Sequence, residues 1–249
     1  MICGGAEKTN GVSLIHSGFK SCLALSKRFD EMEKSSRPFD VKRDGFVLSE
    51  GSGVLVLEEL EFARKRGAKI YGEILGSGMS NDSFDITKPS GIGALSAMQN
   101  AFNSVRNSKF SKNDINFIVA HGTSTVIGDK AETEALVDFF GEKSKEKMTF
   151  STKGALGHTI GASGAIDLII GVKALKEKKI PATKNLEKEI DLKIDFVKKE
   201  SRKIATKCFL ANSFGFGGYN SSIIVGNQFF HLQSKNFRFL TKQNHLRHY

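Results

Sequence analysis

Short apolar runs alternate with longer amphipathic stretches along most of the chain. The apolar run at 53–57 predicts a buried strand, and the helical spacing of 58–66 predicts a helix that ends at Gly67. Further strands are expected at 70–75, 115–120, 148–151, 208–212 and 222–225, and further helices at 94–105, 130–140 and 162–176. This alternation predicts an α/β fold in which helices cover a mixed sheet.

The two ends of the chain depart from this pattern. Residues 2–5 are strand-like but no helix precedes them, as in a fold entered partway through. Residues 228–249 are basic and show no clear period, so a disordered tail is expected there. We therefore predict that 1–66 ends one half of a larger fold, that 67–227 forms its second half, and that 228–249 is the tail.

Composition and charge narrow the class of protein. No apolar run approaches the roughly 18 residues of a membrane span, and 39% of the residues are hydrophobic, enough for a core. The net charge is +10, to which the tail contributes four basic residues and no acid. The remaining charge is spread out and suits an acidic partner as well as a phosphate backbone. We expect no membrane span, no nucleic-acid partner and, because no leader segment is visible, a cytoplasmic location.

The cysteines give no sign of a disulfide or a metal site. Cys3, Cys22 and Cys208 form no C-x-x-C pair, and no histidine lies at metal-ligand spacing from them. Free cysteines are usually small buried residues, which is the expectation for all three.

Three glycine-rich segments contain the residues best suited to chemistry. His121 begins HGTST directly after the predicted strand 115–120, where α/β proteins usually place their sites. Lys153 and His158 lie in STKGALGHTIGASG, which leads into the next predicted helix. The third segment, NSFGFGG, contains Phe216 in a turn between the last two strands, and its glycines allow close approach of a ligand. Neither a phosphate-binding glycine motif nor a serine-hydrolase elbow is present.

The order of these segments resembles that of elongating beta-ketoacyl-acyl carrier protein synthases, the type I/II condensing enzymes with a thiolase-like fold. RPFD at 37–40 and RDGFVLSEG at 43–51 extend the resemblance upstream, and it covers about residues 1–226. It implies a thiolase-like fold of αβαβα layers, here the C-terminal repeat together with the end of the N-terminal repeat.

The resemblance also implies roles for the candidate residues. His121 and His158 match positions that donate ring N–H bonds to a malonyl thioester as it loses carbon dioxide, which requires neutral imidazoles. Lys153 would support them as a nearby cation. Thr123 and Thr125 match the pair of hydroxyls that binds the phosphopantetheine amides.

Further positions carry over in the same way. Phe216 matches a gating phenylalanine whose backbone N–H forms half of an oxyanion hole, and Thr87 falls in a loop at the mouth of the pantetheine tunnel. Arg28 matches a position that meets the acidic carrier protein, and Phe214 is expected in the core. Asp167 stands where relatives have a glutamate paired with the lysine, so a looser pair is expected.

The family's nucleophilic cysteine lies at a helix N-terminus upstream of the strand that begins here at residue 2, so this sequence is expected to lack it. The prediction is a ketosynthase fragment of fatty acid biosynthesis, which performs decarboxylative Claisen condensation of malonyl-acyl carrier protein with an acyl chain. Acyl carrier protein is the expected partner, its phosphopantetheine carries the substrates, no other cofactor is expected, and the full-length enzyme would be a homodimer. A polyketide-type ketosynthase and a non-catalytic subunit resembling a chain-length factor remain alternatives.

Overall fold

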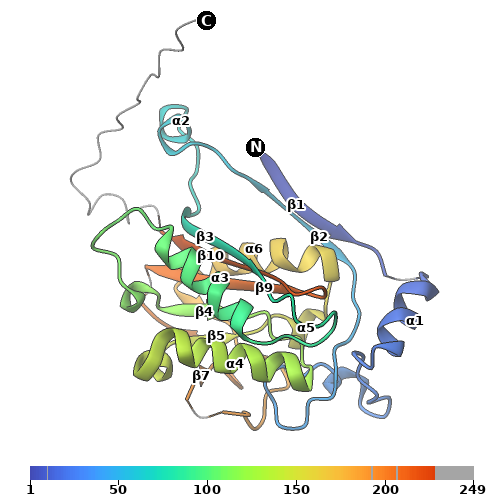
Figure 1. Cartoon of the computed structure of the whole chain (residues 1–249). Helices are drawn as coiled ribbons and strands as arrows, with labels where there is room; N and C mark the ends of the chain where they lie inside the picture. The colour runs from blue at the N-terminus through green and yellow to red at the C-terminus, as the bar shows by residue number, and fades with distance from the viewer. Residues whose placement is uncertain (10, 192, 206, 228–249) are drawn as a thin grey trace, which may run out of the picture.

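A six-stranded mixed sheet forms the centre of the computed structural model, which describes residues 1–227 except 10, 192 and 206 (Figure 1). β10 pairs antiparallel with β3 and β9, and from β9 onward the neighbours are parallel. In spatial order the strands are β3 (Glu73–Asn81), β10 (Tyr219–Gly226), β9 (Cys208–Gly215), β4 (Phe117–Val119), β5 (Met148–Phe150) and β7 (Asp195–Phe196). The predicted α/β class is confirmed.

Helices cover both faces of this sheet, as Figure 1 shows. They are α3 (Ile92–Asn103) and α4 (Val126–Phe140) on one face and α6 (Ser163–Glu177) on the other. Because side chains alternate along a strand, each central strand contributes to two apolar clusters. Ile118 of β4 packs in the cluster of α3 and α4, whereas its neighbour Phe117 packs in the cluster of α6.

The N-terminal residues form a separate layer outside α6. β1 (Ile2–Glu7) and β2 (Gly51–Val56) make a two-stranded antiparallel ribbon that contacts α6. Val54 and Val56 are 63% and 65% exposed, so the prediction of a buried strand here is wrong. The ribbon is covered on one face only among the described residues. Nearby, α1 (Ser13–Ser21) buries no residue, and α2 (Leu60–Lys65) ends just before Gly67, as predicted.

Shorter elements complete the described part of the chain. The sequence pattern missed α1, which has nine residues, and the two-residue strands, which are too short for a period to be visible. These elements are α5 (Lys153–Leu156), β6 (Lys179–Ile180), β8 (Arg202–Lys203) and the 3-10 helices η1 (Met32–Lys34), η2 (Lys112–Asp114), η3 (Gly141–Glu146) and η4 (Ile160–Ala162). The predicted tail, 228–249, lies outside the described residues.

The cysteines, the charges and the helix lengths refine the remaining expectations. Only Cys208 is buried; Cys3 is half-buried and Cys22 is exposed, so the burial prediction is wrong for these two.

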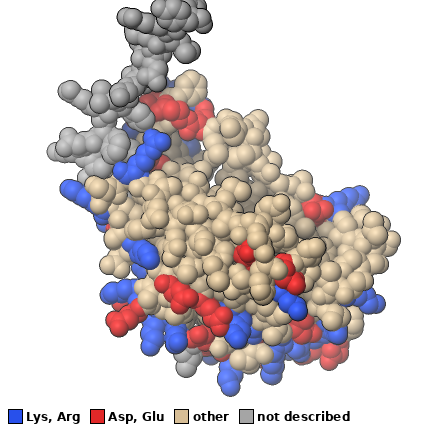
Figure 2. All heavy atoms as spheres, in the orientation of Figure 1, with Lys and Arg blue, Asp and Glu red and all other residues tan. Residues whose placement is uncertain are grey.

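On the face shown in Figure 2, lysines and arginines alternate with acidic residues around the rim rather than forming one patch. Within the described residues, no helix has the length and apolar character that crossing a membrane requires.

Candidate active site

A cavity of about 490 Å³ opens beside the carboxyl ends of β4 and β9. It is lined mainly by apolar side chains, with a few polar groups among them, as expected of a site for a small or elongated ligand. Six of the residues singled out in the sequence line it: Thr87, His121, Thr123, Thr125, His158 and Phe216. Segments far apart in the sequence therefore meet at one place.

The two histidines face each other at the cavity wall. Their ring centroids are 5.5 Å apart, with one ring edge-on to the other at 81°. Phe46 packs edge-on against His158 at 5.0 Å, and Phe214 packs against His121 at 5.5 Å. Phe214 packs against the core cluster, as predicted, and it also lines the cavity.

Both imidazoles are held in the neutral form. Burial lowers the pKa of His158 to about 3 and that of His121 well below its usual value, and the charge of Lys153 adds to both effects. The Nδ1 atom of His158 accepts a hydrogen bond from the backbone N–H of Ile160 at 3.1 Å. The ring hydrogen of a neutral His158 is therefore on Nε2, which makes that atom a donor.

A buried carboxylate holds the His121 loop from behind. Glu132 of α4 is 2% exposed and accepts from the backbone N–H groups of His121 at 2.9 Å and Gly122 at 2.8 Å. The amide of Asn212 adds a third bond at 3.1 Å. Burial raises the pKa of Glu132, and these hydrogen bonds oppose that effect. Sequence reasoning gave Glu132 no role, although it directly fixes the residue that was singled out.

The His158 loop is held through its backbone. The N–H of His158 donates to the carbonyl of Val47 at 2.7 Å, and the N–H of Ser49 donates back to the carbonyl of His158 at 3.0 Å. The adjoining Gly157 has φ 73°, and a Cβ there would lie 2.9 Å from the Cβ of Ser49. Glycine is therefore required where the two segments approach each other.

Lys153 supports the site from a buried position. It is 1% exposed, lies outside the cavity lining and pairs with Asp167 at 2.9 Å. The hydroxyl of Thr152 donates to the same carboxylate at 2.5 Å. The aspartate thus reaches the lysine at full hydrogen-bonding distance, and the expected loosening of this pair is wrong.

The predicted pantetheine-binding threonines all line the cavity. The hydroxyl oxygens of Thr123 and Thr125 are 3.0 Å apart, and that of Thr125 also accepts from the N–H of Gly128 and so caps α4. The hydroxyl of Thr87 donates to Asp85 at 3.1 Å. The structure brings all three threonines to the wall where a ligand would lie.

Phe216 and Arg28 differ in their relation to the cavity. Phe216, at the tip of the β9–β10 hairpin, is 45% exposed and its ring packs against Phe19 at 5.8 Å. Arg28 is half-buried, donates to the carbonyl of Lys42 at 2.9 Å and does not line the cavity. Its role as a docking residue stays a prediction. No cluster of three or more histidine, cysteine or acidic residues in the described part of the chain could bind a metal ion.

A second buried carboxylate on α4 was also missed. Asp129 is fully buried and accepts from the N–H groups of Phe39 and Ser124. Burial raises its pKa to about 7, against the effect of the Phe39 amide and the nearby Arg43. The i, i+3 spacing of Asp129 and Glu132 places both on the side of α4 that faces the glycine-rich loop, but the sequence predicted a helix only from residue 130 and did not show which side is buried.

Comparisons with known proteins place this geometry in context. Residues 71–187 match the C-terminal domain of beta-ketoacyl synthases, and residues 1–63 match the N-terminal domain. The chain is 45% identical over 228 residues to 3-oxoacyl-acyl-carrier-protein synthase 2 of Vibrio harveyi, which covers 90% of this chain and 54% of that protein. The corresponding protein of Rhizobium meliloti is also 45% identical, over 90% of this chain and 53% of its own length. The chain spans about half the length of these curated relatives.

Solved structures show the same architecture. A beta-ketoacyl synthase from Burkholderia phymatum superposes with a TM-score of 0.84 at 39% identity, over 91% of this chain and 54% of that one. A type II polyketide ketosynthase, solved in complex with its acyl-carrier protein, gives a TM-score of 0.86 at 29% identity, over 91% and 56%. These similarities confirm the predicted thiolase-like fold.

Proposed function

Because the chain belongs to the beta-ketoacyl synthase family, we propose that it provides the malonyl-decarboxylating half of a 3-oxoacyl-acyl carrier protein synthase site. The observation that carries this proposal is the pair of neutral histidines at the cavity wall, 5.5 Å apart. Two neutral imidazoles can donate hydrogen bonds to one developing negative charge, which is what decarboxylation of a thioester needs.

In the proposed reaction, the bond between the malonyl carboxylate and C2 breaks and carbon dioxide leaves. The electron pair of that bond passes to C2 and the thioester oxygen as an enolate, which N–H donors of His121 and His158 would stabilise. C2 then attacks the carbonyl carbon of an acyl thioester, and the thiolate of that thioester leaves. No proton has to move to a histidine in the first step, so low histidine pKa values favour it.

The acyl-bearing thiolate is not assigned to any cysteine of this sequence. Cys208 is buried within β9, and burial raises its pKa. Cys3 lies on the β1–β2 ribbon away from the cavity lining. Cys22 does line the cavity, but it caps the carboxyl end of α1, where the helix dipole disfavours an anion. The proposal for this chain is therefore decarboxylation and binding of the malonyl substrate, as part of the condensation.

Fatty acid synthesis is the favoured context. The curated relatives at 45% identity are named 3-oxoacyl-acyl-carrier-protein synthase 2, whereas the polyketide ketosynthase above is 29% identical. A non-catalytic subunit would need neither the histidine pair nor the buried lysine behind it. Both features favour an enzyme over a structural partner.

Acyl carrier protein is the proposed partner, with Thr87, Thr123 and Thr125 contacting the phosphopantetheine arm that presents the substrate. The net charge of +10 suits an acidic carrier, and a carrier-bound ketosynthase is among the structural relatives. Arg28 remains the proposed docking residue. A homodimer and a cytoplasmic location follow from the resemblance and the visible sequence alone and stay predictions.

The test measures carbon dioxide release from malonyl-acyl carrier protein by the full chain. We expect His121→Ala and His158→Ala each to lower the rate by roughly a hundredfold or more, the cost of losing one oxyanion donor. His16→Ala, on the exposed face of α1, is the matched control and should keep the rate. If the folded chain released carbon dioxide no faster than buffer, or if the histidine variants kept the rate, the proposal would be wrong.

A further inference from the structure

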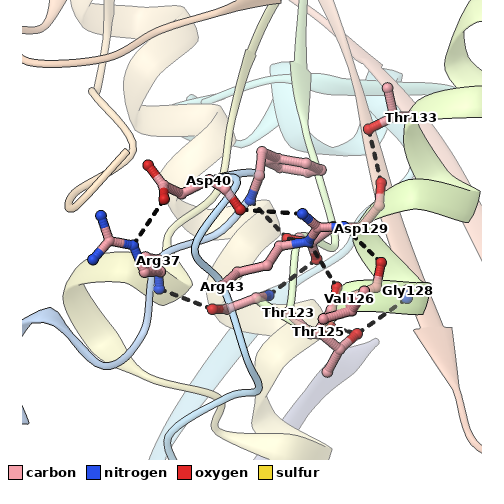
Figure 3. Close-up of polar contacts among 12 residues, drawn as sticks. Arg37, Asp40, Arg43, Thr123, Thr125, Val126, Gly128, Asp129 and Thr133 are labelled. Carbon is pink, nitrogen blue, oxygen red and sulfur yellow. Dashed lines mark hydrogen bonds and ion pairs between the residues drawn. The ribbon is translucent and has the colours of Figure 1, made fainter. Parts of the chain in front are cut away.

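Four buried charged side chains join the segment 37–43 to the start of α4 (Figure 3). Arg37, Asp40, Arg43 and Asp129 are all 9% exposed or less. Burying charges is costly unless each one meets oppositely charged or hydrogen-bonding groups. So much buried charge at one place indicates that it fixes a conformation that apolar packing alone would leave loose.

Arg43 is the centre of this arrangement. Its guanidinium donates to the carbonyls of Thr125 at 3.0 Å, Val126 at 2.6 Å and Asp40 at 3.1 Å. The same group lies 3.6 Å from the Asp129 carboxylate. A planar guanidinium can serve several acceptors at fixed angles, which a lysine cannot do. Arg43 therefore fixes the residue that caps α4 and the residue after it.

Asp129 fixes the residue between the two threonines. Ser124 has φ 71°, a left-handed backbone that is costly for a residue other than glycine. Its N–H donates to Asp129 at 3.0 Å, and its hydroxyl accepts from the N–H of Arg37 at 2.9 Å. Its carbonyl accepts from the N–H of Gly45 at 2.9 Å. Every polar group of Ser124 is thus bound, and the direction of the chain between Thr123 and Thr125 is fixed.

Neither Arg43 nor Asp129 lines the cavity, whereas Thr123 and Thr125 do. We propose that Arg43, together with Asp129, is a positioning residue that presents the Thr123–Thr125 hydroxyl pair to the pantetheine arm of the substrate. The identity of that ligand rests on the function proposed above. The positioning itself rests on the contacts of Arg43 and Ser124 and does not depend on the reaction.

This role separates binding from chemistry. The backbone of His121 is held by Glu132 and that of His158 by Val47 and Ser49. Arg43 is therefore not the group that holds either histidine. Loss of the guanidinium should displace the threonines and leave the histidine pair in place. A substrate with the pantetheine arm should therefore bind less tightly, and the binding of one without the arm should not change.

The decisive variant is Arg43→Lys, which keeps the charge but cannot reach three carbonyls and a carboxylate together. With malonyl-pantetheine we expect KM to rise roughly tenfold, the loss of about one hydrogen bond to the ligand, while kcat changes little. With the malonyl thioester of methanethiol, which lacks the pantetheine arm, neither KM nor kcat should change. Arg64→Lys, on exposed α2 with a surface partner, is the matched control and should leave both substrates unaffected.

A second measurement does not need activity. Hydrogen exchange of the peptide spanning 122–128 should rise at least severalfold in Arg43→Lys, and that of 153–160 should stay as in the parent chain. If Arg43→Lys unfolds, the pair Arg43→Met with Asp129→Asn removes both charges and is compared in the same way. Unchanged exchange at 122–128, an equal rise at 153–160, or equal KM changes for both substrates would overturn the proposal. A parent chain without decarboxylase activity would instead count against the proposed function, and the exchange result would still decide the role of Arg43.

Discussion

The loops of His121 and His158 meet at one cavity wall, but they are held by different means. The His121 loop is bound by side chains: two carboxylates of α4 reach its backbone N–H groups. The His158 loop is bound by backbone groups of the segment that contains Val47 and Ser49, and the Lys153–Asp167 pair lies behind it. One loop thus has two buried carboxyl groups behind it, of which Asp129 pairs with Arg43, and the other has the Lys153–Asp167 pair, yet both imidazoles stay neutral because burial dominates.

This difference separates what holds each histidine from what sets its charge. Disturbing Glu132 should release the backbone of His121 and Gly122 alone. Disturbing Lys153 should act mainly on the stability around Asp167 and on the pKa of both histidines, since its charge reaches both. The two loops can therefore be tested independently.

Breaking the Lys153–Asp167 pair should have the largest effect on stability. Lys153→Met leaves the Asp167 carboxylate buried without its charge partner, and we expect the free energy of unfolding to fall by about 3 to 5 kcal/mol, as measured by urea denaturation. Lys173→Met removes an exposed pair with Glu177 of 3.9 Å and should cost less than about 1 kcal/mol. Similar losses in the two variants would show that the buried pair is not what stabilises the His158 side.

Removing the carboxylate behind His121 should have an intermediate effect. Glu132→Ala removes the acceptor of the His121 and Gly122 N–H groups and of the Asn212 amide, and we expect a loss of about 2 kcal/mol together with faster hydrogen exchange at 121–122. Exchange at 157–158 should not change. Glu134→Ala, on the exposed side of the same helix, is the control. If both loops exchanged faster in Glu132→Ala, they would be one unit rather than two.

The smallest change near neutral pH is expected in the NMR signal of His158, because its ring should not titrate there. Its folded pKa of about 3 lies below the value of about 6.5 for a free imidazole, so its NMR signal should not shift between pH 5 and 8. The unfolded chain takes up this proton as the pH falls below about 6.5, whereas the folded chain does so only near pH 3, so His158 lowers stability progressively over that window. His158→Gln identifies the signal and should remove this part of the acid dependence. A midpoint near 6.5 in the folded chain would mean that the ring is not buried as described.

The sequence was informative where a residue acts through its own position in a motif. HGTST, STKGALGH and GFGG each predicted a side chain at the cavity, and the structure brings those side chains together. Lys153 was also expected behind them. Local motifs of this kind can be recognised from the sequence because the turn and the side chain lie within a few residues of each other.

What could not be predicted depends on contacts made across the fold. Asp129 and Glu132 lie in a helix whose pattern does not distinguish a polar residue facing solvent from one facing a buried loop. β2 appeared buried from its apolar run, but among the described residues α6 and η4 pack against one face of the ribbon, and Val54 and Val56 remain exposed. The burial of a strand depends on which layer packs against it, and the sequence of the strand alone does not show whether such a layer is present.

The paired threonines have a consequence for how a ligand can bind. The two hydroxyls have two hydrogens between them; one is used in their mutual bond, and one lone pair of Thr125 is taken by Gly128. Whichever way the mutual bond points, one hydrogen is left over, and it is that of Thr125 when Thr123 donates and that of Thr123 when Thr125 donates. A ligand carbonyl beside the pair would therefore meet one free O–H donor in either orientation of the mutual bond.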